Sequence, residues 1–186
     1  MQVNLRVCGA PARIQTVGTD TAEAIAAGTA RLDRQLDRLT TGWEPWPWPD
    51  PDRRALNAPG GRRIHRHKTY TLPVQRPCQA TATLNAMDYD AFLFTDADTR
   101  EDALVYRCGP AGVRLARQYT MRPPWPPTGP PLTVNPRSTL RLTISDATRQ
   151  VAAGWLPFLF FTEADTGRGN LLYRRYDGGL GLITPV

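Results

Sequence analysis

Two histidines offer the first possible chemistry in this sequence. His65 and His67 stand two residues apart in the run RRIHRHK, residues 62–68. On a strand both side chains would face the same side, as a pair of metal ligands does. However, the neighbouring cations repel a metal ion, and no further ligand accompanies the pair. We therefore interpret the run as a basic strand that faces phosphates or solvent, and we expect neither a metal nor another cofactor.

An acidic run at residues 96–102, DADTRED, superficially resembles a calcium-binding loop. It lacks the central glycine and the distal bidentate glutamate of such loops. The corresponding run at residues 163–169, EADTGRG, has only two acids where the first run has four. Asp and Thr side chains bond to the backbone in tight turns, so we predict a hairpin turn in both runs.

Catalytic motifs are missing from the sequence. It contains two serines, Ser138 and Ser145, without a G-x-S-x-G elbow, and it has no phosphate-binding loop and no dinucleotide-binding motif. We expect no enzymatic activity and no small-molecule substrate. The odd number of cysteines (Cys8, Cys78 and Cys108), without a C-x-x-C pair, indicates reduced thiols in the cytoplasm. No stretch is long and apolar enough to predict a membrane span or a signal peptide.

Basic residues are concentrated in the first third of the chain. The formal net charge is +6, and Lys68 is the only lysine among 23 basic residues. Residues 1–68 hold 11 basic and 7 acidic groups. Arginine forks bind phosphates and stack on bases, so this pattern favours binding to the RNA backbone, although a merely solvated face would have the same composition. The candidate RNA-binding residues are Arg6, Arg13, Arg31, Arg34, Arg38, Arg62, Arg63, Arg66 and Lys68.

Aromatic residues concentrate in the later strands. Most such residues form the core of a sheet, but Phe158 and Phe160 point opposite to Phe161, which leaves both faces of that strand apolar. An apolar second face needs a cover, so we expect it to form an interface between modules. The candidates for this interface are Phe92, Phe94, Tyr106, Phe158, Phe160, Phe161 and Tyr173.

The first 40 residues predict a small β-β-α unit. Alternating polar and apolar residues indicate a hairpin of strands at about 2–7 and 13–17. Asp20 and Glu23 have the spacing of a capping box. A helix follows to about residue 40, with an arginine-rich outer face opposite an inward apolar stripe, which consists of Ile25, Thr29, Leu32, Leu36 and Leu39. This unit is too small for a comfortable domain.

Two proline-rich segments, residues 41–63 and 119–131, predict semi-stiff linkers. The first contains Trp43, Trp46 and Trp48, which need a groove on a neighbouring domain or on a partner.

Between and after the linkers the sequence repeats itself. Residues 89–107 align with residues 156–174 without a gap at an offset of 67, with identical pairs such as Phe94/Phe161, Tyr106/Tyr173 and Arg107/Arg174. Such an ungapped run indicates internal duplication. We therefore predict two modules, residues 64–118 and 132–186, each of which orders its elements β-α-β-β-β.

In the first module we predict strands at 64–72, 89–95, 103–107 and 113–118, with a helix at 75–87. In the second we predict a helix at 145–155 and strands at 158–162, 170–176 and 180–184; its first strand lies near 140–143 or 132–134. The fold class is α+β: a partial N-terminal β-β-α unit followed by two tandem β-α-β-β-β modules joined by Pro-rich linkers. Each sheet with one helix buries one face only, so two modules should pair face to face.

The repeated motif resembles a known family. The patterns F-L-F-T-D-A-D-T-x4-L-V-Y-R at 92–107 and F-F-T-E-A-D-T-G-R-G-N-L-L-Y-R-R-Y-D-G-G-L-G-L-I-T-P at 160–185 resemble the C-terminal domain of long-form ribosome hibernation promoting factors. Residues 1–40 look like the closing half of the family's N-terminal ribosome-binding domain, without its opening strand-helix-strand. The two-copy arrangement resembles the actinobacterial, dormancy-associated branch.

This resemblance implies binding to 16S rRNA of the small ribosomal subunit and repression of translation during dormancy. The best matched binding residues are Arg31, Arg34 and Arg38; Arg6 and Arg13 match less well. In single-copy members the C-terminal domain homodimerises and joins two ribosomes. Two modules on one chain suggest instead an intramolecular pseudo-dimer. The alternative function is a protein-binding adaptor or homodimerisation module with no direct RNA contact.

Overall fold

The computed structural model describes residues 1–16, 18–41, 61–108, 112–124, 132–154, 156–175 and 177–186. The expected linker at 41–63 falls almost entirely outside these residues, together with its three tryptophans, and so does residue range 125–131 of the second. The described residues form β1 (Gln2–Val7), β2 (Ala10–Gln15), α1 (Thr21–Thr41), β3 (Ile64–Tyr70), β4 (Val74–Gln75), α2 (Pro77–Ala86), β5 (Ala91–Asp96), β6 (Asp102–Arg107), β7 (Val113–Arg117), β8 (Leu132–Val134), β9 (Arg141–Leu142), α3 (Ile144–Gly154), β10 (Phe158–Glu163), β11 (Gly169–Arg174) and β12 (Leu180–Pro185).

The N-terminal unit consists of the predicted hairpin and helix, and both predictions are confirmed. Strands β1 and β2 pair antiparallel around a two-residue turn at Cys8 and Gly9, which both have positive φ angles (48° and 80°) as a tight hairpin requires. Helix α1 begins after Asp20, whose carboxylate accepts the backbone N–H of Glu23 at 2.8 Å. Glu23 in turn accepts the backbone N–H of Thr19 at 2.7 Å, so the capping pair is present with its reach one residue longer than expected.

Helix α1 presents a different face to the protein from the one its apolar stripe predicts. Its fully buried residues are Gly28, Arg31 and Gln35, whereas Ile25 is 53% exposed and Leu32 is half-buried. The expectation of an outward arginine face is therefore wrong for Arg31. The reason is a set of polar acceptors beneath the helix, described below, which bind the long polar side chains.

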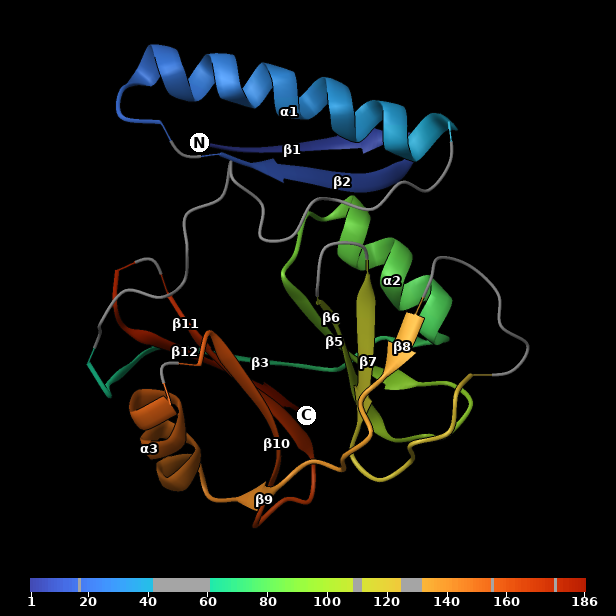
Figure 1. Ribbon diagram of the computed structural model, residues 1–186, viewed down its shortest axis with the longest axis vertical. Coiled ribbons are helices and arrows are strands. Elements are labelled where there is room, and N and C mark those ends of the chain that lie inside the picture. Colours follow the sequence, from blue (N-terminus) through green and yellow to red (C-terminus); the bar gives the residue numbers. More distant parts are fainter. Residues whose placement is uncertain (17, 42–60, 109–111, 125–131, 155, 176) are drawn as a thin grey trace.

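Two five-stranded sheets make up the rest of the described chain (Figure 1). One has the order β4-β5-β6-β7-β8, and the other has the order β3-β12-β11-β10-β9. The elements β4, α2, β5, β6 and β7 begin 67 residues before β9, α3, β10, β11 and β12, respectively, so the two copies of the repeat fold alike. The acidic run forms the predicted turn, because the Asp96 carboxylate accepts the backbone N–H of Asp98 at 2.9 Å. Arg100 and Gly167, at equivalent positions in the two turns, both have a positive φ angle.

The first strand of each copy joins the sheet of the other copy. We expected the strand at 64–72 to open the sheet of the first module; instead β3 pairs in parallel with β12 of the second. Strand β8, one of the two locations considered for the first strand of the second module, pairs in parallel with β7 of the first. The other location forms β9, which pairs with β10 in its own sheet. Neither sheet has all five strands without a segment from the other copy.

Three apolar clusters hold these layers together. Helix α2 covers one face of its sheet, where Ala80 and Leu84 of the helix pack with Phe94 of β5. Helix α3 covers the other sheet, where Val151 packs with Phe161 of β10. The third cluster lies between the sheets and draws buried residues from both copies, namely Leu72, Leu93, Leu104, Ala116, Phe160 and Leu171. At about 1.5–3 kcal/mol for each large side chain removed from water, its burial contributes on the order of 10 kcal/mol, comparable with the net stability of a small domain.

Candidate functional site

The N-terminal unit is attached to the first module by a buried ion pair. The Arg31 guanidinium donates from Nε to Asp88 Oδ2 at 3.1 Å and from Nη2 to Asp88 Oδ1 at 2.9 Å. The two side chains are 1% and 0% exposed. Asp88 has a positive φ angle of 50° just after α2, which turns its carboxylate toward α1. A bidentate, fully buried pair of this kind is costly to break from one side.

Donors of the N-terminal unit also bond to carbonyl oxygens at the end of α2. Gln35 Nε2 donates to the carbonyl oxygens of Asn85 at 2.7 Å and Ala86 at 3.1 Å. Arg13 Nε donates to the carbonyl oxygen of Met87 at 3.0 Å. The last carbonyls of a helix have no partner within the helix and carry its negative dipole end, so cationic and amide donors fit there. The unit is therefore placed on this helix end by specific contacts.

These contacts change the set of predicted rRNA-binding residues. Arg31 is withdrawn from it, because its guanidinium is buried against Asp88 and does not reach the surface. Arg13 and Arg38 are half-buried, and Arg13 lies over the ring of Tyr89 at 4.4 Å. The remaining candidates are at the surface: Arg6, Arg34, Arg62, Arg63 and Arg66 are exposed, and Lys68 is half-buried. Arg66 and Lys68 lie on β3, and Arg62 and Arg63 lie just before it.

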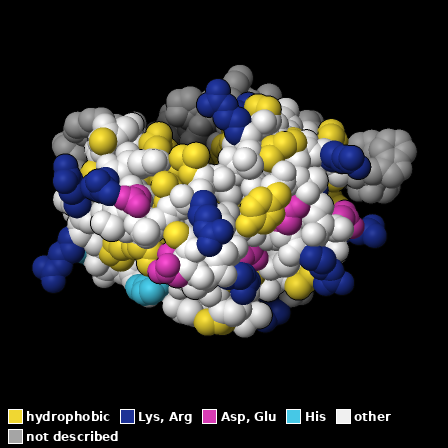
Figure 2. All heavy atoms as spheres, turned by 90° about the horizontal axis from the view of Figure 1, so that it is seen from below, with side chains coloured by type: hydrophobic (Ala, Val, Ile, Leu, Met, Phe, Trp, Pro, Cys, Tyr) yellow, Lys and Arg dark blue, Asp and Glu magenta, His cyan; other side chains and the backbone are white. Residues whose placement is uncertain are grey.

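The face of the molecule opposite the N-terminal unit carries a mixture of charged and hydrophobic side chains. Figure 2, viewed from below, shows Lys and Arg side chains dispersed between hydrophobic ones, with acidic side chains next to several of them. This face shows no continuous basic surface among the residues drawn in colour, so it does not resemble a track for a phosphate backbone.

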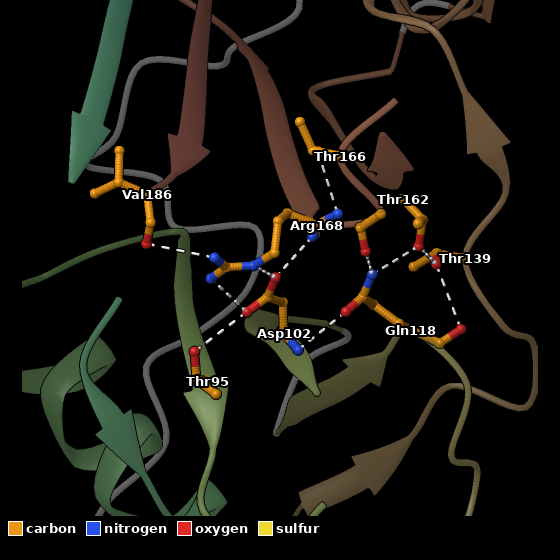
Figure 3. A network of polar contacts seen from close by, with 10 residues as sticks. Thr95, Asp102, Gln118, Thr139, Thr162, Thr166, Arg168 and Val186 are labelled. Carbon is orange, nitrogen blue, oxygen red and sulfur yellow. Dashed lines mark hydrogen bonds and ion pairs between the residues drawn. The ribbon is translucent and has the colours of Figure 1, made fainter. Parts of the chain in front are cut away.

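A polar network joins the two modules where β6 meets β11 (Figure 3). The buried Asp102 carboxylate accepts Arg168 Nε at 2.8 Å and the backbone N–H of Gly169 at 2.8 Å through Oδ2. Its Oδ1 accepts Thr95 Oγ1 at 3.2 Å. The hydrogen bonds to Asp102 raise the pKa of the Arg168 guanidinium above its usual value. One carboxylate of the first copy is thus satisfied largely by the second.

Gln118 extends the network. Its Oε1 accepts the backbone N–H of Asp102 at 3.1 Å, and its Nε2 donates to Thr162 Oγ1 at 3.0 Å and to the carbonyl oxygen of Gly167 at 2.9 Å. Thr162 also bonds to Thr139 at 2.7 Å. The amide oxygen of Gln118 therefore bonds to the first copy, and its amide nitrogen bonds to the second.

The network is asymmetric, because equivalent positions of the two copies carry different residues. At the offset of 67, Gly169 is the counterpart of Asp102, and Arg168 is the counterpart of Glu101. A Cβ atom on Gly169 would lie 2.6 Å from Asp102 Cβ and 2.8 Å from a ring atom of Phe160, so the glycine is needed for this approach. Glu101 instead accepts the backbone N–H groups of Tyr119 and Thr120, in the segment that directly follows its own copy. At these two positions the first copy has the carboxylates of Glu101 and Asp102, whereas the second has the guanidinium of Arg168 and a glycine without a side chain.

The predicted interface aromatics do not share one location. Phe158 and Phe160 belong to the cluster between the sheets, together with Tyr106, whose ring meets that of Phe158 edge-on at 5.3 Å between centroids. Burial raises the pKa of the Tyr106 hydroxyl. Phe92 and Phe94 instead pack in the cluster beneath α2, and Phe161 packs beneath α3, so these three are corrected to cores of single modules. Tyr173 pairs with Phe158 across β10 and β11 and is half-buried.

Other candidate chemistry receives no geometric support. Among the residues described, no three His, Cys, Asp or Glu side chains lie close enough together to hold a metal ion. His67 Nε2 lies 2.9 Å from Thr184 Oγ1. All three cysteines are free thiols. Neither α1 nor the two shorter helices combine the length and apolar character of a membrane span.

Comparison with known proteins identifies a family. Residues 60–115 match the family described as the Sigma 54 modulation/S30EA ribosomal protein C terminus. The whole chain is 50% identical over 195 aligned positions to two proteins of Mycobacterium tuberculosis, from strains CDC 1551/Oshkosh and H37Rv, both described as "Dormancy associated translation inhibitor". The match covers 100% of this chain and 70% of each relative. The chain belongs to the ribosome hibernation promoting factor family.

The matched segment of this hibernation factor includes β3, which lies in the sheet of the second copy. The segment that matches the family in sequence therefore does not coincide with the strands of one sheet. Sequence reasoning found the basic residues and the repeat, but it missed Asp88, Asp102, Gln118 and Arg168. The signal for Asp102 and Arg168 was divergence between the copies at residues 100–103, which align with residues 167–170 and lie between identical residues on both sides.

Proposed function

We propose that this hibernation factor binds the small ribosomal subunit through 16S rRNA and represses translation, with its two modules paired within one chain. The observation that carries the first part is full-length 50% identity to proteins described as dormancy-associated translation inhibitors. Exposed arginines on β1, on α1 and in the segment leading into β3 support contact with an RNA backbone.

Co-sedimentation of the full chain with small subunits tests RNA binding. If six to ten phosphates are contacted, raising salt from about 50 to 200 mM should weaken binding by roughly 10³-fold or more. Substituting Arg6→Glu and Arg34→Glu together should weaken it further at fixed salt. Arg137→Glu is the matched control, because Arg137 is exposed and lies outside the first third of the chain. Equal binding by the two variants would count against an RNA contact at β1 and α1.

The pairing of the modules within one chain is supported by the divergence at Asp102. Two first copies meeting through this surface would place two Asp102 carboxylates together, whereas the second copy offers Arg168 and the backbone of Gly169. Like charges in a buried contact are disfavoured. The copies are therefore complementary to each other rather than to themselves.

Light scattering on the purified full chain tests the pairing. A mass near that of one chain, 20.7 kDa, at micromolar concentration is the expected result. A stable dimer that persists on dilution would overturn the intramolecular arrangement.

A protein-binding adaptor is the second candidate, and one observation favours it. Helix α1 leaves Ile25 exposed and Leu32, Leu36 and Leu39 incompletely buried on its outer side, which is the kind of apolar surface that a protein partner covers. Apolar docking does not weaken steeply with salt, so the same co-sedimentation series separates the two functions.

A further inference from the structure

A cavity of about 480 Å³ lies where the N-terminal hairpin approaches both sheets. Gln2, Arg13 and Gln15 line it from β1 and β2; β3 and the segments around β5 and β11 supply the other walls. Figure 1 shows this hairpin as a layer above the ends of the two sheets. The volume falls within the range of small-ligand pockets. None of the interactions described above requires a space there.

Positive charge converges on this cavity. Five basic and two acidic residues line it; Arg174 is turned away, toward the carbonyl oxygens of Val151 and Leu156. Arg13, Arg66, Lys68 and Arg175 remain, and of these Arg175 forms an ion pair with Asp177, another lining residue, at 2.9 Å. Burial, followed by the repulsion of those three arginines, lowers the pKa of the Lys68 ammonium. No carboxylate in the described part of the chain forms an ion pair with Lys68 or Arg66, so their charge is uncompensated and favours an anion.

The walls next to these cations are aromatic. Tyr89 stacks on Phe92 with their ring planes 4° apart and centroids 6.0 Å apart, and Arg13 covers Tyr89. On the other side, the Tyr173 ring lies against Gly181, where an added Cβ would come within 2.3 Å of the ring. These rings are therefore fixed in place before any ligand arrives. Fixed aromatic faces beside arginines suit a planar, electron-rich ring.

Two cations of this cavity, Arg66 and Lys68, have no basic counterparts at the equivalent positions of the other copy. At the offset of 67, the counterparts of Lys68 and Arg66 are Asn135 and Thr133. The counterpart of Gly181 is Arg114, whose Nε lies 3.4 Å from Thr133 Oγ1. The cations are thus not required by the fold of the repeat, which exists without them in the other copy.

We propose that this cavity binds a nucleotide, with its phosphate at Arg13, Arg66 and Lys68 and its base against the aromatic walls. The ligand is a nucleoside monophosphate unit, and it has two sources: a free nucleotide or one nucleotide of an RNA strand. The site goes beyond the proposed function, because a free nucleotide would bind without the ribosome.

Titration calorimetry on the full chain tests this, using adenosine 5′-monophosphate, adenosine, inorganic phosphate and a four-nucleotide oligoadenylate. Adenosine monophosphate should bind at least tenfold more tightly than adenosine or phosphate alone, because it uses both the cations and the rings. An oligoadenylate that binds tenfold more tightly still would identify an RNA strand as the source; equal affinity would identify the free nucleotide.

Lys68→Asn installs the residue of the other copy and should weaken nucleotide binding at least tenfold. Arg66→Thr does the same at an exposed position that the fold tolerates, so it serves if the Lys68 variant is unstable. Asn135→Ala, the matched control, should change affinity less than twofold. Three results would each overturn the proposal. They are the absence of binding at millimolar nucleotide, phosphate that binds as tightly as the nucleotide, and an Arg66→Thr variant with unchanged affinity.

Discussion

The contact between Asp102 and Gly169 gives a prediction whose magnitude follows from the structure. We expect Gly169→Ala to lower the free energy of unfolding by about 1–3 kcal/mol, the usual cost of overpacking. The new Cβ would lie 2.6 Å from Asp102 Cβ and 2.8 Å from the Phe160 ring. Both neighbours belong to paired strands, β6 and β10, so neither can move alone.

Gly169→Asp restores the residue of the first copy and adds a second carboxylate. Two such charges about 4 Å apart interact by roughly 4 kcal/mol at an effective dielectric constant near 20. Arg168, whose side chain is 38% exposed, offsets part of this. We therefore expect the Gly169→Asp variant to be about 2 kcal/mol less stable than the Gly169→Ala variant at neutral pH.

The difference between these two variants should depend on pH. Repulsion within the pair raises the pKa of one carboxyl in the folded state above its unfolded value of about 3.9. A raised carboxyl pKa destabilises the folded state at high pH, and that penalty disappears as pH falls below the unfolded value. The gap between the variants should thus close as pH is lowered from 7 toward 4.

Urea unfolding of the full chain, followed by far-ultraviolet circular dichroism, measures these free energies. Gly112→Ala is the control, because its Cβ would meet its nearest atom at an ordinary 3.5 Å and should cost less than about 0.5 kcal/mol. A Gly169→Ala variant as stable as the native chain would refute the close approach. Equal stability of the Gly169→Ala and Gly169→Asp variants at neutral pH would refute the electrostatic reasoning.

Two further predictions concern the N-terminal unit. Arg31→Ala should release α1 from the first module, because it leaves the buried Asp88 carboxylate unpaired at a cost of about 3–5 kcal/mol; hydrogen exchange should show α1 losing protection while β5 and β6 keep theirs, with exposed Arg34→Ala as the control. Hydrogen bonds from the Thr19 side chain and then its backbone lower the pKa of Glu23, so its capping contribution is present above the unfolded pKa and is lost as pH falls through the lowered folded value. The N–H resonance of Thr19, which donates to Glu23, should therefore shift as pH falls below about 4.3, and Glu23→Gln should remove that dependence; an unchanged titration would contradict the assignment.

Local patterns predicted most elements correctly, because hairpins, capping residues and helical spacing act over a few residues. The exchange of β3 and β8 could not be foreseen, since the edges of two similar sheets offer nearly the same hydrogen bonds to either strand. The orientation of α1 was mistaken for a related reason: Arg31 and Gln35 are drawn inward by acceptors at the end of α2, which lie some 50 residues later in the chain.

The candidate site was predicted in composition but not in geometry. Arg66 and Lys68 were singled out as part of a basic strand, yet nothing in the sequence placed them beside Tyr173 and Arg175, which follow about 105 residues later. Likewise, the alternation along β10 correctly indicated an apolar second face, but it did not reveal that Phe161 lies beneath α3.

The exchange of first strands also sets the timing of assembly during synthesis. Among the strands that the structure describes, β3 pairs only with β12, and His67 has Leu182 as its partner, 115 residues later. At ~5–20 residues per second, the interval between making the two strands is on the order of 10 s, much longer than the microseconds a hairpin needs to form. The second sheet therefore cannot close while the chain is still growing through β11. A protein that acts on ribosomes would in this way complete its second sheet only after the ribosome that makes it has passed β12.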